Sequence, residues 1–116
     1  MEKQIIEFSA PGNQLLKRIT PLRTFASDTI NYIEARFDLS DEWSGYNERY
    51  AVWYNDTMQC GSLIDSDGKT IIPKEVLEAP GLLKMNLCFN QVENNRVVAR
   101  NTSYPIDALR LTGTIV

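Results

Sequence analysis

Short runs of alternating apolar and polar residues, separated by closely spaced turns, constrain the fold of this chain more than any other feature. Along its 116 residues, apolar and polar side chains alternate in short stretches, and turn signals recur about every 8–12 residues, as in all-β sandwiches and barrels. A period of two places alternate side chains on opposite faces of a strand. Stretches with helical period span one or two turns at most. The pattern therefore predicts an all-β protein.

The clearest predicted strands cover residues 29–38, 48–54 and 83–89. In the first of these, one set of alternate residues is apolar and should face the core: Ile33, Ala35 and Phe37. In residues 48–54 both alternate sets are apolar, so periodicity leaves the inward phase open. If Ala51 and Trp53 point inward, then Tyr50, Val52 and Tyr54 point outward.

Segments with turn-forming residues separate the other predicted elements of the chain. Residues 10–13, 55–56, 65–68 and 93–95 carry Pro, Gly, Asn or Asp in combinations that favour turns. Residues 40–45 and 73–77 each fit a single helical turn, the second with a proline at its start. We expect Trp43, which is too large to leave in water, to fold back and plug one end of the core.

These elements sum to seven or eight short strands and one or two single-turn helices. We therefore predict an antiparallel β-sandwich, Ig-like or jelly-roll-like, with a small closed barrel as the alternative. The length fits one domain, which we assign to residues 1–110, with residues 111–116 as a strand end or a linker. Phe37, Trp43 and Trp53 are the expected anchors of its core.

Composition excludes several function classes. The chain has no histidine, which removes Ser-His-Asp and Cys-His nucleophile systems and the commonest transition-metal ligand. A net charge of −3 argues against a nucleic-acid partner, which favours a basic stripe. The N-terminal residues lack the apolar core of a signal peptide, and no stretch of about 18 apolar residues predicts a membrane span. We expect Cys60 and Cys88 to be buried small side chains, with a single bridge as the alternative.

One acidic turn resembles the opening of a calcium loop. Asp65, Asp67 and Gly68 have the spacing of its first positions, but Lys69 and Val76 stand where an EF-hand needs oxygen ligands. We therefore interpret the stretch as a tight turn and predict no metal and no cofactor.

A second acidic cluster precedes a tryptophan. Asp38, Asp41 and Glu42 lie just before Trp43, and paired carboxylates beside an indole occur in sugar-binding and glycosidase sites. Helix capping and a solvated turn explain them more simply. A glycosidase also needs a long cleft, which a domain of this size rarely provides.

Four side chains form the candidate interface. If strands 29–38 and 48–54 pair, Tyr32, Arg36, Tyr50 and Tyr54 share one outward sheet face. Tyrosine and arginine are enriched at protein interfaces, and a flat aromatic face also stacks on sugar rings. Cross-strand pairing that only stabilises the sheet is the third interpretation.

Three sequence blocks resemble a family of phage virion proteins from Gram-positive hosts. The blocks are residues 37–53, with a D-x-W-x-G-like turn before an A-V-aromatic strand; residues 70–77, TIIPKEVL; and residues 80–83, PGLL. In the second block one extra residue separates threonine from proline. The resemblance implies a β-sandwich at the N-terminus of a baseplate, tail-fibre or head-fibre protein. It implies no catalytic residues, and this chain stops at Val116 where family members usually continue.

We therefore predict a non-enzymatic virion structural protein, made in the host cytoplasm, that anchors a fibre or baseplate component to the particle. Its expected partners are other virion proteins and further copies of itself. The alternative is a carbohydrate-binding module for cell-wall glycan, which would need exposed tryptophan or tyrosine near carboxylates. A carboxylate hydrolase is the least favoured interpretation.

Overall fold

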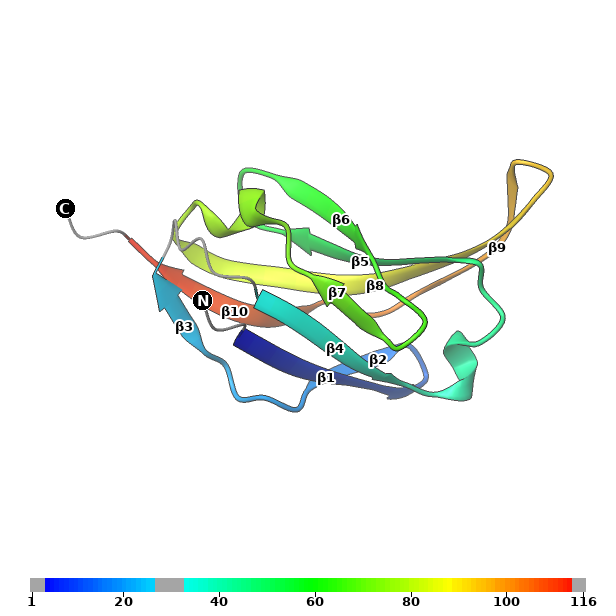
Figure 1. Cartoon of the computed structure of the whole chain (residues 1–116), viewed down its shortest axis with the longest axis horizontal. Coiled ribbons are helices and arrows are strands. Elements are labelled where there is room, and N and C mark those ends of the chain that lie inside the picture. Colours follow the sequence, from blue (N-terminus) through cyan, green and yellow to red (C-terminus); the bar gives the residue numbers. More distant parts are fainter. Residues whose placement is uncertain (1–3, 27–32, 114–116) are drawn as a thin grey trace.

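The computed structural model describes residues 4–26 and 33–113, which form a β-sandwich of ten strands (Figure 1). One sheet has the strand order β2 (Leu15–Arg18), β1 (Gln4–Gly12), β4 (Ile33–Leu39) and β7 (Lys69–Ile71). The other has the order β3 (Thr24–Ala26), β10 (Ile106–Thr112), β8 (Gly81–Glu93), β5 (Glu48–Tyr54) and β6 (Gln59–Leu63), with β9 (Arg96–Thr102) also pairing with β8. The sandwich is the predicted fold, with more strands than the predicted seven or eight.

Both sheets are mixed. Most pairs are antiparallel, as predicted, but β1 pairs with β4 and β3 pairs with β10 in parallel. Parallel neighbours cannot be joined by a tight turn, so the chain visits other elements between the members of each pair. Strand β10 begins directly after Pro105, which has no N–H to donate to a ladder, and it extends to Thr112.

The two predicted helical turns are present as short 3-10 helices. The first, η1 (Asp41–Trp43), links β4 to β5, and the second, η2 (Lys74–Leu77), links β7 to β8. Each carries the chain from one sheet to the other. Buried apolar side chains on both helices, including Trp43, Val76 and Leu77, join the core.

Aromatic rings fill the space between the sheets. Phe8 of β1 stacks on Phe37 of β4 with ring centroids 5.3 Å apart, and it meets the edge of Trp53 of β5 at 6.4 Å. The indole N–H of Trp53 donates to Ser62 Oγ of β6 at 2.8 Å. The core is therefore continuous from one sheet to the other.

A tryptophan closes one end of the sandwich. Trp43 is 2% exposed, and its ring lies edge-on to Phe89 of β8 with centroids 5.0 Å apart. Tyr46 contacts the same phenylalanine at 6.2 Å. This is the arrangement expected for a large ring in a turn, because only burial removes its apolar surface from water.

The turns follow the predicted chemistry, with one difference. Asn94 and Asn95 both have positive φ, 51° and 62°, as a two-residue turn between antiparallel strands requires. Gly68 has φ 79°, also as predicted. However, residues 65–68 do not join neighbouring strands of one sheet, because β6 and β7 belong to different sheets.

Candidate functional site

The outer face of β6, β5 and β8 carries two of the predicted interface residues. Ala51 and Trp53 are fully buried, so the alternate residues of β5, including Tyr50 and Tyr54, face outward. Cross-strand register places Tyr50 between Leu63 and Cys88, and Tyr54 between Gln59 and Lys84. Leu63 is 67% exposed, so this face offers aromatic and aliphatic surface, with two charged side chains: Lys84 opposite Tyr54, and Glu48 at the start of β5.

Arg36 is not part of this face, which corrects the prediction of one four-residue surface. It lies on β4, and β4 pairs with β1 and β7 rather than with β5. The Arg36 Nε donates to Glu34 Oε2 at 2.6 Å on the same strand. The physical reason is that η1 carries the chain across to the opposite sheet between β4 and β5. Tyr32, the fourth predicted residue, lies outside the described residues.

The three expected core anchors are all buried. Phe37, Trp43 and Trp53 are 7%, 2% and 0% exposed. Neither indole is therefore accessible for stacking on a sugar ring. Cys60 and Cys88 are both free, so they form no bridge. Both are half-buried rather than buried as predicted, and Cys88 lies opposite the outward-facing Tyr50 on the outer side of the sheet.

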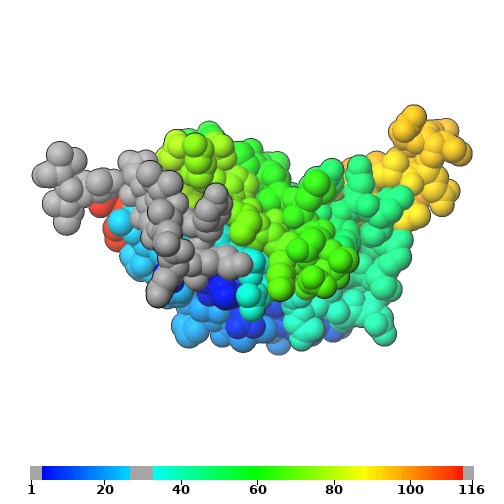
Figure 2. Space-filling model, in the orientation of Figure 1, coloured from blue at the N-terminus to red at the C-terminus, as the bar shows by residue number. Residues whose placement is uncertain are grey.

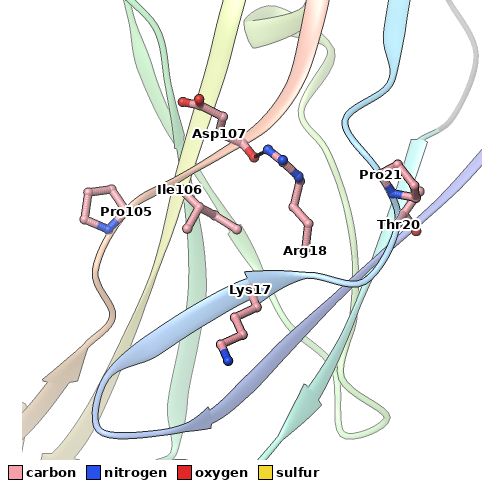
Figure 3. Close-up of a pocket in the computed structure, with 7 residues that line it drawn as sticks. All are labelled: Lys17, Arg18, Thr20, Pro21, Pro105, Ile106 and Asp107. Atoms are coloured by element: carbon pink, nitrogen blue, oxygen red, sulfur yellow. Dashed lines mark hydrogen bonds between the residues drawn. The ribbon is translucent and has the colours of Figure 1, made fainter.

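An open groove lies between the end of β2 and the start of β10 (Figure 3). It has a volume of about 550 Å³ and is lined by Lys17, Arg18, Thr20, Pro21, Pro105, Ile106 and Asp107. The Arg18 Nη1 donates to the backbone oxygen of Asp107 at 2.8 Å, across the groove. Lys17 extends away from this bond, as Figure 3 shows. The lining combines two cations, one carboxylate and apolar side chains, and sequence reasoning missed the groove because its two walls are far apart in the chain.

The β8–β9 hairpin forms an arm, defined here as residues 91–100, that projects beyond the sandwich (Figures 1 and 2). The pairing of β5 with β8 stops at Asn90, while β8 continues to Glu93. All residues from Arg96 to Arg100 are exposed. The arm contributes to a molecule of 50 × 27 × 26 Å.

A side-chain amide fixes the base of the arm. Asn47 Nδ2 donates to the Val92 backbone oxygen at 2.8 Å, and the Val92 N–H donates to Asn47 Oδ1 at 2.8 Å. Asn47 directly precedes β5, and its side chain thus takes the place of a strand neighbour beside Val92, beyond the last β5–β8 pair. Glu48 Oε1 accepts a bond from Asn90 Nδ2 at 3.2 Å, and Asn90 Oδ1 accepts one from Arg100 Nε at 2.7 Å. The arm therefore leaves the sandwich in a defined direction.

In the part of the chain that the structure describes, the Cys, Asp and Glu side chains form no group of three that could hold a metal ion. None of the helices in this part is long and apolar enough to cross a membrane.

Comparison with solved structures shows the fold. The chain resembles the N-terminal domain of phage TP901-1 ORF48 with a TM-score of 0.61 and 13% sequence identity. The similarity covers 97% of this chain and 99% of that one. No protein-family description and no curated protein sequence matches the chain.

Proposed function

We propose that this chain is a structural domain of a phage particle, which anchors a fibre or baseplate component through protein contacts. The observation that carries the proposal is the end-to-end similarity in fold to the N-terminal domain of a phage protein. The three sequence blocks in residues 37–83 support it independently, because they resemble phage virion proteins of Gram-positive hosts. The partners would be other virion proteins and further copies of this chain.

The surface supports binding rather than chemistry. The outer face around Tyr50 and Tyr54 carries aromatic and aliphatic side chains, and tyrosine is a frequent anchor at protein interfaces. The arm adds a second, projecting surface. We also propose a non-enzymatic role for the chain, as its sequence predicts.

Inactivation of the gene in the phage genome that encodes the chain tests the proposal. We expect particles that lack one fibre or baseplate component in negative-stain electron microscopy. The full chain supplied from a plasmid should restore that component and should itself be found in purified particles. Complete, infectious particles that contain no trace of the protein would overturn the proposal.

Glycan binding is the second candidate, and one observation favours it. Tyr50 and Tyr54 lie four residues apart on one outward face of β5, about 13 Å from each other at the rise of a strand, a separation that suits stacking on an extended sugar chain. Titration of the full chain with cell-wall glycan fragments, followed by NMR, would detect it. Binding that is lost in Tyr50→Ala and Tyr54→Ala would support this function, and unshifted spectra would exclude it.

A further inference from the structure

The arm has one covered edge and one open edge. Strand β5 and the Asn47 amide cover the β8 edge as far as Val92. Strand β9 pairs with β8 alone among the strands that the structure describes. A two-stranded ribbon is marginally stable by itself, and an open apolar edge is a template for contact with another chain. The arm thus has the features of a docking element.

The side chains of the arm are apolar and basic. Val97 and Val98 are 49% and 55% exposed, and they lie between Arg96 and Arg100. The Arg96 guanidinium has no hydrogen-bond or ion-pair partner in the described part of the chain, whereas Arg100 bonds only to Asn90. Glu93 is the one carboxylate of residues 91–100, so the arm has a charge of +1. The positive charge of the arm favours an acidic partner.

The end of the sandwich from which the arm projects is acidic. Residues 37–48 contain four carboxylates and no lysine or arginine. The half-buried cations Arg36, Arg49 and Lys69 border this end, and they are fewer than its carboxylates. Glu42 Oε1 accepts a bond from Asn101 Nδ2 at 3.2 Å, which places η1 beside the base of the arm. Two further carboxylates come from residues 65–68, and this turn lies at the same end because the Phe37 N–H donates to the Gly68 oxygen at 2.8 Å. We call Asp38, Asp41, Asp65 and Asp67, all exposed, the acidic end.

We propose that the arm of one copy docks on the acidic end of a second copy, and that the second copy returns the same contact. The proposal deepens the proposed function, since it names a partner for a particle component. Because the arm and the acidic end lie at the same end of the molecule, one two-fold axis forms both contacts at once and closes the assembly. Arg96 and Arg100 then face carboxylates, and the two exposed valines are covered.

Charge also argues against the simplest competing dimer. Two β9 edges paired antiparallel about an axis at Val98 would place Arg96 of one copy opposite Arg100 of the other. Like charges directly opposite each other destabilise a sheet. Contact with the acidic end removes this repulsion and replaces it with attraction.

A charge swap tests the contact on the full chain by sedimentation velocity. We expect the native chain to be dimeric at about 100 μM, the range in which weak complexes form, and to dissociate as salt is added. Arg96→Glu with Arg100→Glu, or Asp41→Lys with Asp67→Lys, should raise the dimer Kd at least about tenfold, because each set makes the contact repulsive. Asp65 is left unchanged because its Oδ1 caps the 65–68 turn.

The two variants mixed in equal amounts should dimerise again, because in the mixed pair both contacts join opposite charges. Arg110→Glu, an exposed arginine on β10, is the matched control and should dimerise like the native chain. Thermal melting of each variant separates loss of contact from loss of fold. A native chain that is monomeric throughout, or a dimer that survives both swaps, would overturn the inference. A monomer that is still incorporated into particles would overturn the arm contact and leave the proposed function standing.

Discussion

The two buried tryptophans differ in one respect that stability measurements can detect. Trp53 and Trp43 are 0% and 2% exposed, and each meets a phenylalanine edge-on. The indole N–H of Trp53 donates to Ser62 Oγ at 2.8 Å, but Trp43 Nε1 has no partner among the described residues. We predict that Trp53→Phe destabilises the fold clearly more than Trp43→Phe.

The expected difference in unfolding free energy depends on the costs that differ between the two substitutions, because the costs that they share cancel. Both lose apolar burial and leave a small cavity, at about 1–2 kcal/mol each. Trp53→Phe also loses a hydrogen bond worth about 0.5–1.5 kcal/mol, whereas Trp43→Phe removes an unsatisfied donor whose burial costs about 1–3 kcal/mol. The free energies of unfolding of the two variants should therefore differ by about 1.5–4.5 kcal/mol, within a typical domain stability of about 5–15 kcal/mol.

Urea unfolding measures this difference, because each variant retains one tryptophan as a fluorescent reporter. With a slope of about 2 kcal/mol per molar urea, the midpoint of Trp53→Phe should lie about 1–2 M below that of Trp43→Phe. Far-UV circular dichroism should give the same midpoints if unfolding is two-state. Equal midpoints, or a lower midpoint for Trp43→Phe, would refute the reasoning.

Two further substitutions test the arm and the 65–68 turn, which precedes β7 and accepts a hydrogen bond from Phe37 of β4. Asn47→Ala should lower the hydrogen-exchange protection of the Val92 amide about thirtyfold, because two hydrogen bonds of about 1 kcal/mol each are lost. Unchanged protection would show that Asn47 does not hold the arm. Gly68→Ala should destabilise far more than Gly45→Ala, since both glycines have positive φ but only at Gly68 would the new Cβ lie 2.6 Å from the Phe37 oxygen. Gly45→Ala should cost only the conformational penalty of about 1–2 kcal/mol, and similar urea midpoints for the two would contradict this account.

Local chemistry made much of the fold predictable. Asn94 and Asn95 could be predicted to form a turn, because asparagine readily adopts positive φ. The alternation in residues 33–37 and 83–89 identifies the faces of these strands that are buried. The inward phase of β5 remained open in the sequence because both faces are apolar. In the structure Trp53 points inward, where its ring is fully buried and its N–H donates to Ser62 Oγ.

The assignment of strands to sheets was not predictable, because it depends on contacts between distant parts of the chain. Strands β4 and β5 follow one another in sequence but lie in opposite sheets, so Arg36 is separated from Tyr50 and Tyr54. Strand β3 has only three residues and no alternation long enough to detect. Its parallel pairing with β10 joins residues more than 80 positions apart. The groove between β2 and β10 was missed for the same reason.

The most direct test of the central claim is the copy number of the chain in purified phage particles, measured by quantitative mass spectrometry against a known capsid protein. The account predicts a fixed number of copies per particle that survives high-salt washing and that scales with one fibre or baseplate protein. A chain that is abundant in the lysate but absent from washed particles would contradict the account.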